Sequence, residues 1–249
     1  MSKILVTDGR YSHTLGIIRS LAKLGHKVDC IGHPLCLSSF SKSTNKCSYK
    51  QSLFSERFID EFLLFLEKNK YDFLIPIGAR SIHLVNKFRK DIEKKTNINL
   101  APRKSIEICL NKKHLLSLAE NLGIPVPKTY NKKQFNALIN SREYLNKKLV
   151  VKPSSELSDD KVIYLSKIEH KKNKFFDVNN YLIQDYIQGE GYGFFAIYDH
   201  GQLKEFFMHQ RIRENPITGG SSVCAKSIFD QELYSYGTDL LNKLNWHGV

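Results

Sequence analysis

The sequence of 249 residues predicts two domains of different class. The first is an α/β domain with a small doubly wound parallel sheet, because apolar runs alternate with helical patterns up to about residue 100. The second is an α+β domain, because short strands dominate beyond residue 111 and a helix stands at each end of that half. The hydrophobic content of 41% is ample for a core.

The first domain begins with an apolar strand at 3–7. A helical pattern follows up to Leu24, where Gly25 is a natural end, and a second strand is expected at 27–32. This strand–helix–strand order implies parallel pairing. Later elements are expected in the same alternation, with helices at 55–68 and 81–95 around a buried strand at 71–78.

The second domain is expected to begin with a helix that Asn111 caps and Gly123 ends. The last helix covers about 233–244, and residues 246–249 then resemble the beginning of a further strand. This pattern predicts that the second domain is C-terminally incomplete. Between the helices the expected elements are strands at 148–153, 161–165 and 181–187, and a hairpin over 193–212 that turns at 199–201.

The net charge of +13 raises the question of nucleic-acid binding. The cations occur mainly in short pairs, and a denser group is found at 170–174 without interleaved aromatic residues. We therefore interpret the charge as a solvated basic surface and rank a basic nucleic-acid-binding protein as the last alternative. No segment is long and apolar enough for a membrane span, so a soluble protein is expected.

Five cysteines stand at positions 30, 36, 47, 109 and 224, without a C-x-x-C pair. An odd number without such spacing argues against a disulfide framework and fits a reducing cytoplasm. Cys30, His33 and Cys36 are close in sequence but lack the second ligand pair typical of zinc sites, so no metal is expected there.

Three segments of the second domain have side chains suited to phosphate chemistry. Lys152 ends an apolar strand and is followed by Pro153 and small hydroxyl residues, although a surface lysine at a strand end is the simpler alternative. The segment 181–191 delivers polar side chains and then Glu190 between glycines, an order that suits adenine and ribose contacts or, alternatively, an edge strand with a bulge.

The third segment contains Arg211 and Arg213, which alternate on one expected strand. Their side chains should therefore leave the same face, where an anion between them would relieve the repulsion of two guanidinium groups. Solvated edge arginines are the alternative.

The order of Lys112, Lys152, the segment 184–191 and the segment 210–222 along the chain resembles the ATP-grasp superfamily, especially its carbamoyl-phosphate synthase large-subunit type. The resemblance covers about 111–249. It implies a pre-ATP-grasp α/β domain at 1–105, a small lobe at 106–187 and a partial large lobe at 188–249. It also implies that ATP activates a carboxylate as an acyl phosphate, which an amine or related nucleophile then displaces.

The resemblance implies roles for particular residues. For ATP binding it implies Lys112, Lys152, Ser154, Ser155, Gln184, Asp185, Tyr186, Ile187 and Glu190. For the γ-phosphate or the acyl phosphate it implies Arg211, Arg213, Gly219, Gly220 and Ser221. The carboxylate and amine substrates are expected at strand ends of the first domain, where α/β folds bind ligands, with Arg10, His13, Arg80 and Ser81 as candidates.

The sequence departs from the family pattern at three places. The segment 154–160 lacks the usual glycines and is acidic, which would repel phosphate, and Glu190 stands one residue early. The strands that carry the Mg²⁺ ligands in this family would follow Val249, so no metal ligand is expected within this chain. We expect the chain alone to be inactive, either because a companion chain or absent strands complete the ligase, or because it is a remnant that only binds nucleotide.

Overall fold

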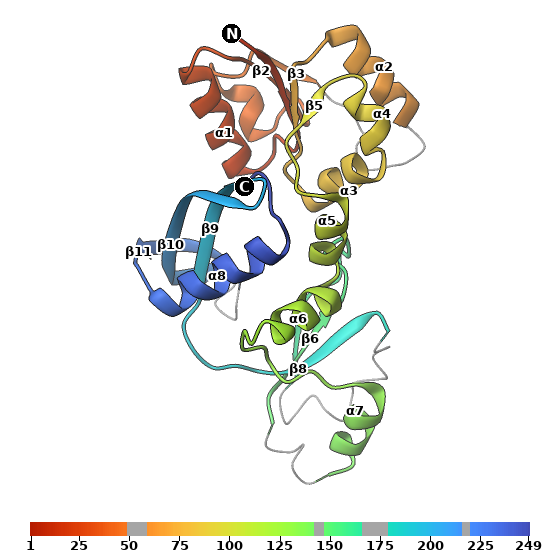
Figure 1. Cartoon of the computed structure of the whole chain (residues 1–249), viewed down its shortest axis with the longest axis vertical. Helices are drawn as coiled ribbons and strands as arrows, with labels where there is room; N and C mark the ends of the chain where they lie inside the picture. Colours follow the sequence, from red (N-terminus) through yellow and green to blue (C-terminus); the bar gives the residue numbers. More distant parts are fainter. Residues whose placement is uncertain (49–58, 142–146, 166–178, 216–219) are drawn as a thin grey trace. The chain divides into compact units, whose positions relative to one another are not determined.

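The computed structural model describes residues 1–48, 59–141, 147–165, 179–215 and 220–249. The chain divides into two units, Met1–Ile106 and Glu107–Val249, which are described separately (Figure 1). The start of the helix expected at 55–68, the basic segment 170–174 and the candidate Gly219 lie outside the described residues.

The first unit contains a parallel five-stranded sheet in the order β3-β2-β1-β4-β5. The strand order reverses beside β1, as in a doubly wound fold, so the predicted fold class of this domain is confirmed. The two edge strands are short and were not predicted from the sequence. The strands are β1 (Lys3–Val6), β2 (Lys27–Ile31), β3 (Lys46–Ser48), β4 (Phe73–Ile75) and β5 (Asn97–Ile98).

Helices cover both faces of this sheet (Figure 1). The single helix expected at 81–95 is interrupted at Phe88, whose φ of -101° and ψ of 24° leave the α region. Gly25 ends the first helix with a φ of 85°, as predicted. The helical elements are α1 (Ser12–Lys23), the 3-10 turn η1 (Leu37–Phe40), α2 (Ile59–Asn69), α3 (Ala79–Lys87), α4 (Arg89–Glu93) and α5 (Arg103–Leu110).

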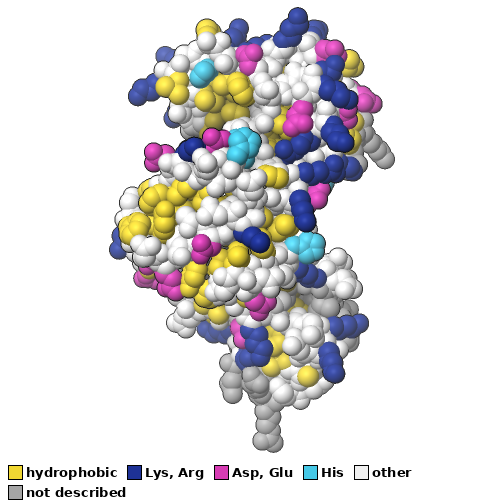
Figure 2. Space-filling view, in the orientation of Figure 1, with side chains coloured by type: hydrophobic (Ala, Val, Ile, Leu, Met, Phe, Trp, Pro, Cys, Tyr) yellow, Lys and Arg dark blue, Asp and Glu magenta, His cyan; other side chains and the backbone are white. Residues whose placement is uncertain are grey.

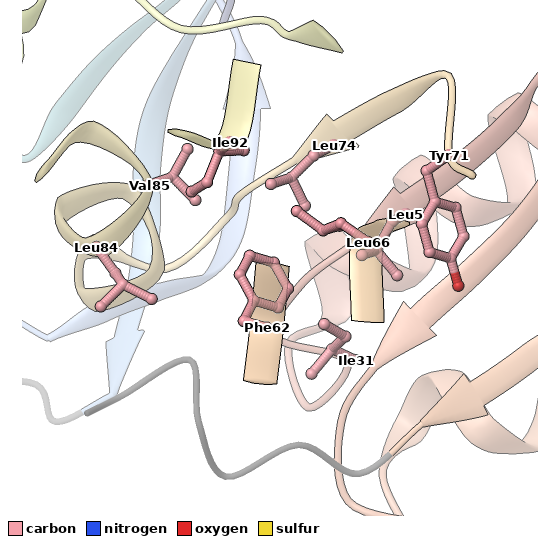
Figure 3. Close-up of a cluster of buried hydrophobic side chains, with 9 residues drawn as sticks. All are labelled: Leu5, Ile31, Phe62, Leu66, Tyr71, Leu74, Leu84, Val85 and Ile92. Carbon is pink, nitrogen blue, oxygen red and sulfur yellow. The ribbon is translucent and has the colours of Figure 1, made fainter. Parts of the chain in front are cut away.

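The alternation of side chains along β1 gives the sheet a core on each face. Ile4 and Val6 pack with Ile18 of α1 on one face. Leu5 points to the other face, where Phe62 of α2 belongs to the same fully buried cluster (Figure 3). An apolar strand buried on both faces is what a parallel sheet between two helix layers requires.

The second unit contains two antiparallel sheets, in the orders β7-β6-β8 and β11-β10-β9. Asn111 caps α6 and Gly123 follows its end with a φ of 73°, both as predicted, whereas α7 and β11 were not predicted. The elements are α6 (Lys112–Asn121), α7 (Lys132–Ile139), β6 (Leu149–Pro153), β7 (Ile163–Leu165), β8 (Tyr181–Asp185), β9 (Tyr192–Asp199), β10 (Gln202–Asn215), β11 (Ser221–Ser227) and α8 (Gln231–Lys243).

Helix α8 packs on the second of these sheets through aromatic rings (Figure 1). Phe194 of β9 meets Tyr234 edge-to-face at a centroid distance of 6.1 Å and stacks on Phe206 of β10 at 6.1 Å. Gly237 lies over the Phe194 ring so closely that a Cβ atom there would stand 2.5 Å from a ring carbon. The missing side chain therefore sets how closely the helix approaches the sheet.

Lys and Arg side chains are dispersed over the visible face with acidic side chains among them (Figure 2). Within the described part of the chain, no helix is both long and apolar enough to cross a membrane.

Replacement of Gly237 by Ala should destabilise the second unit. Alanine improves helix propensity by about 1 kcal/mol, but overpacking against the half-buried Phe194 ring costs about 1–3 kcal/mol. Urea unfolding can be followed by the fluorescence of Trp246, the single tryptophan of the chain, which follows α8.

The matched control is Gly16→Ala in α1, where a Cβ atom would meet nothing within 4 Å. There the propensity gain should act alone and stabilise the first unit by about 1 kcal/mol, as measured by circular dichroism. Equal stabilisation by both substitutions would contradict the packing of α8 against Phe194.

Candidate functional site

Main-chain hydrogen bonds fix the beginning of α6 against the end of β6. The Lys112 amide donates to the Ser154 carbonyl at 2.8 Å, and the Glu156 amide donates to the Leu110 carbonyl at 3.0 Å. Asn111 and Ser155 form an isolated antiparallel bridge at the same place. The first residue of the helix and the strand end that carries Lys152 are thus held side by side by backbone contacts.

This junction brings Lys112 and Lys152 into electrostatic contact. Burial is the main cause that lowers the pKa of Lys152, and the charge of Lys112 lowers it further. Glu156 acts in the opposite direction on that pKa, and its Oε1 atom lies 3.0 Å from Lys112 Nζ. The site is therefore a pair of cations with one carboxylate as internal counter-ion, an arrangement suited to an anionic ligand.

The contact of Glu156 with Lys112 was not predicted. The acidic segment 154–160 was expected to repel phosphate, whereas the structure uses one of its carboxylates to compensate a lysine. The hydroxyl groups of the two candidate serines serve the backbone: Ser154 Oγ donates to the Asn180 carbonyl at 3.0 Å, and Ser155 Oγ accepts from the Leu157 amide at 3.1 Å. Only the acidic composition signalled a role for Glu156.

The candidates at the end of β8 divide into two kinds. Gln184 is buried and its amide donates to Thr129 Oγ1 at 2.8 Å, and Asp185 accepts from the Tyr130 hydroxyl at 2.7 Å. These two side chains therefore tie β8 to the segment that precedes α7. Tyr186 and Ile187 are exposed instead, the latter by 65%, and offer an apolar surface.

Glu190 is engaged by neighbouring side chains on the second sheet. Its Oε2 atom accepts a hydrogen bond from the Tyr192 hydroxyl at 2.9 Å and another from the Gln210 amide. A ribose hydroxyl would have to compete with these two donors.

Arg211 is held by a carboxylate three residues further along the strand. Its Nη1 atom donates to Glu214 Oε1 and to the Gly220 carbonyl, both at 3.2 Å, while its buried Nε atom has no hydrogen-bond partner among the described residues. Gly191 makes this approach feasible, because a Cβ atom there would stand 2.8 Å from both Arg211 Cδ and Glu214 Oε1.

The expectation that Arg211 and Arg213 share a face assumed a regular strand. The register against β11 shifts between these two residues and again between Arg213 and Glu214. Such a bulge interrupts side-chain alternation and allows Arg211 to reach Glu214. The assumption of a regular strand at these two arginines is therefore wrong. Arg213 is exposed, whereas Arg211 is half-buried. Ser221 pairs with Asn215 in the same ladder.

Glu214 on the second sheet acts electrostatically on Tyr164 of the first sheet. Burial, Tyr186 and Glu214 all raise the pKa of Tyr164 on β7, so the Arg211–Glu214 pair lies within electrostatic range of the segment that follows β8. Among the described residues, neither Lys112 nor Lys152 shows an ion pair with the carboxylate that holds Arg211.

In the first unit, the ends of β1 and β4 are joined by side chains that sequence reasoning missed. Thr7 Oγ1 donates to Asp8 Oδ2 at 2.5 Å and accepts from the Ile77 amide at 3.0 Å, and Asp8 Oδ2 also accepts from the Gly78 amide at 2.8 Å. Asp8 has a φ of 59°, an uncommon value for a residue with a side chain. Only its position directly after a strand signalled Asp8.

The four substrate candidates lie on the segments that follow β1 and β4. Arg10 Nη2 donates to the Tyr11 hydroxyl at 2.7 Å, and the Tyr11 ring stacks on His13 at 5.0 Å. Ser81 is buried on α3, and its hydroxyl has no hydrogen-bond partner in the described part of the chain. Arg80, its neighbour, is exposed.

Comparison with protein families identifies a family model described as "ATP-grasp domain", which matches residues 109–248, more than half of the chain. A search of curated proteins finds no match.

Solved structures share the fold at low sequence identity. An L-amino acid ligase from Bacillus licheniformis is similar with a TM-score of 0.65 and 14% identity over 98% of this chain and 60% of that one. The biotin carboxylase domain of a 2-oxoglutarate carboxylase from Hydrogenobacter thermophilus gives 0.67 and 14% over 98% and 58%. An N5-carboxyaminoimidazole synthase from Aspergillus clavatus gives 0.63 and 14% over 99% and 63%. This chain spans about 60% of the length of these proteins.

Replacement of Lys152 by Met should stabilise the second unit by about 0.5–1 kcal/mol, because it removes a half-buried cation beside Lys112. The gain in the free energy of unfolding should shrink as the pH rises toward 10.5, the ordinary pKa of lysine. The lowered pKa means that the folded protein releases the Lys152 proton before the unfolded chain does, so wild-type stability rises with pH in that window.

Urea unfolding followed by Trp246 fluorescence measures both effects. The control is Lys113→Met, because Lys113 Nζ donates to the Asn179 carbonyl at 2.8 Å and should not share the gain. A loss of stability in Lys152→Met would contradict the electrostatic cost assigned to Lys152.

Proposed function

Because the chain belongs to the ATP-grasp family, we propose that it binds ATP as part of a carboxylate–amine ligase, with the triphosphate at Lys112 and Lys152. The observation that carries this proposal is the packing of two lysines at one helix–strand junction, with a single glutamate as counter-ion. A lysine whose pKa is lowered by burial and by a specific charged neighbour is a candidate for a functional site. Binding of a polyanion there relieves the repulsion between the two ammonium groups.

The exposed apolar side chains of Tyr186 and Ile187 suit a base that lies against the segment after β8. Phosphate oxygens at Lys112 compete with Glu156, whose carboxylate lies 3.0 Å from the ammonium nitrogen in the free protein. Arg211 suits the terminal phosphoryl group, because its side chain is partly exposed and Glu214 holds the guanidinium in place. Glu190, Arg213, Gly219, Gly220 and Ser221 stay predictions as contacts of the nucleotide.

In the proposed reaction a carboxylate oxygen of the substrate attacks the γ-phosphorus, and the bond to the β–γ bridging oxygen breaks to release ADP. The resulting acyl phosphate is attacked at its carbonyl carbon by the amine, which loses a proton as inorganic phosphate leaves. Cationic side chains contribute by stabilising charge on the transferred group. Arg10, His13, Arg80 and Ser81 are proposed contacts of the substrates, and they select no particular molecule.

The ligase chemistry of this family uses Mg²⁺, which prefers oxygen ligands in octahedral geometry. Among the described residues, the one group of three ligand-type side chains with donor atoms within 4.8 Å of one another is Asp199, His200 and His247. Two imidazole nitrogens do not suit Mg²⁺. The described residues thus present no magnesium site of this kind, and no step of the reaction is assigned to a metal ion.

The ligands bound in similar structures motivate the substrate class. The Hydrogenobacter protein was crystallised with MgADP and bicarbonate, and the Aspergillus protein with ADP and an aminoimidazole ribonucleotide. Identities near 14% support only a shared fold. The proposal for this chain therefore names only two classes of substrate, a carboxylate and an amine. Likeness to the carbamoyl-phosphate synthase type stays a prediction. Neither a companion chain nor a nucleic-acid partner is supported by these findings.

Substitutions of the two partners should change ATP affinity in opposite directions. Lys152→Ala should weaken binding about 10- to 100-fold, the loss expected for a charged hydrogen bond to phosphate. Glu156→Gln should strengthen binding up to about fivefold, because it frees Lys112 from a half-exposed ion pair of modest energy. Isothermal titration calorimetry with ATP measures both.

Lys113→Ala is the matched control, because it removes one positive charge from the adjacent position and should leave the affinity nearly unchanged. Equal losses in Lys113→Ala and Lys152→Ala would indicate a general charge effect. That result, or weaker binding by Glu156→Gln, would contradict the proposed site.

A further inference from the structure

We propose that Asp199, His200 and His247 form a binding site for a divalent transition-metal ion of the Zn²⁺ class. Asp199 ends β9, His200 lies in the β9–β10 turn, and His247 lies on the segment that follows α8. The donor atoms of all three lie within 4.8 Å of one another. This site is independent of the proposed nucleotide site and of the proposed function.

The separations between donor atoms approach those of ligands around one metal ion. Asp199 Oδ1 lies 3.6 Å from His247 Nδ1 and 3.9 Å from His200 Nε2. Two ligands at bond lengths of about 2.0–2.1 Å in a tetrahedral site are about 3.4 Å apart. Both observed distances exceed that of a direct hydrogen bond. Because the two rings are stacked nearly parallel, their lone pairs converge on one ion only if the exposed His200 side chain turns out of the stack, which leaves room for a cation between the three groups.

The backbone holds the two histidines at this place. The His200 amide donates to His247 Nδ1 at 3.2 Å, and the two rings stack at a centroid distance of 4.1 Å. Because Nδ1 accepts this hydrogen bond, it carries a lone pair and no proton. For a metal ion to bind Nδ1, the imidazole must first turn away from this amide, because the amide nitrogen stands 3.2 Å away along the lone pair.

The conformation of the turn adds a second observation. His200 has a φ of 47° and Gly201 a φ of 80°, the two positive values of a tight hairpin turn in which Asn-Gly is the favoured pair. Histidine accepts this conformation less readily than asparagine does. An uncommon backbone conformation at a side chain that converges with two other ligands is a reason to propose a function.

The chemistry of the donors selects the metal. Two imidazoles and one carboxylate suit Zn²⁺, Co²⁺ or Ni²⁺ and leave a fourth position for water, whereas Mg²⁺ prefers oxygen ligands. Lys204 Nζ lies 3.6 Å from Asp199 Oδ2, so Oδ1 is the oxygen that remains for the ion. A bound metal ion would link the segment after α8 to the β9–β10 hairpin. It would add to the hydrogen bond that the Gly201 amide donates to the Trp246 carbonyl at 2.7 Å.

The test is titration of the untagged full chain with Co²⁺, followed by visible absorption and by quenching of Trp246 fluorescence. We expect one bound ion with imidazole and carboxylate ligation, without the intense ultraviolet band of a cysteine thiolate. Zn²⁺ should displace Co²⁺, whereas Mg²⁺ should not. Metal saturation should also raise the Tm of the Trp246 transition.

The informative variant is His200→Asn, because asparagine tolerates the positive φ and keeps the turn while it removes the imidazole. It should weaken Co²⁺ binding by about tenfold or more, as should His247→Ala. His114→Ala, a change at an exposed histidine of α6, should leave Co²⁺ binding unchanged.

Unchanged Co²⁺ affinity in His200→Asn would overturn the proposal, as would a thiolate spectrum or an absence of binding to the wild-type chain. ATP affinity serves as an independent readout. His200→Asn should not alter it, so loss of metal binding and failure of the nucleotide site are distinguishable.

Discussion

The chemistry of the second unit depends on one constraint: the backbone holds two lysines at the same helix–strand junction. Lys112 cannot move away from the end of β6, because its own amide is bonded to the Ser154 carbonyl. Lys152 is fixed by the ladder of β6, where it pairs with Leu182. Burial and mutual repulsion keep the pKa of Lys152 low, and Glu156 offsets part of that cost. Binding of a polyanion relieves this repulsion, which is a gain in binding free energy that a solvated lysine pair would lack.

The same arrangement recurs at other cations of this unit. Glu214 holds Arg211 at 3.2 Å, and Asp185 lies 3.5 Å from Lys147 Nζ. Lys112 and Arg211, two of the charged donors that the sequence suggested for ligand binding, therefore each have a carboxylate close to them in the free protein. The net charge of +13 says little about this local pairing. Selectivity for an anion then depends on whether the anion outcompetes the carboxylate, not on the total charge.

Long periodic elements and special backbone positions were predictable from the sequence. Asn111 and Gly123 bound α6, and the hairpin turns at His200 and Gly201. The doubly wound order also followed from the alternation of elements. These features depend on capping, turn geometry and side-chain period, so each can be predicted from a single short segment of sequence.

Features that depend on neighbouring chain segments were not predictable. Strands β3 and β5 have three and two residues and show no period of their own. The helix break at Phe88 and the bulge at Arg211 depend on packing and on register with β11. The partner of Lys112 could not be found either, because Glu156 reaches it through a junction between a helix and a strand end that lie far apart in sequence.

The most direct measurement is an NMR titration of the Lys152 ammonium group, in the free protein and with ATP bound. In the free protein its pKa should lie below 10.5, since burial and Lys112 disfavour the charge. With ATP bound the pKa should rise, because the phosphates stabilise the ammonium form. A Lys152 pKa that is ordinary in the free protein and unmoved by ATP would contradict the placement of the triphosphate at this lysine pair.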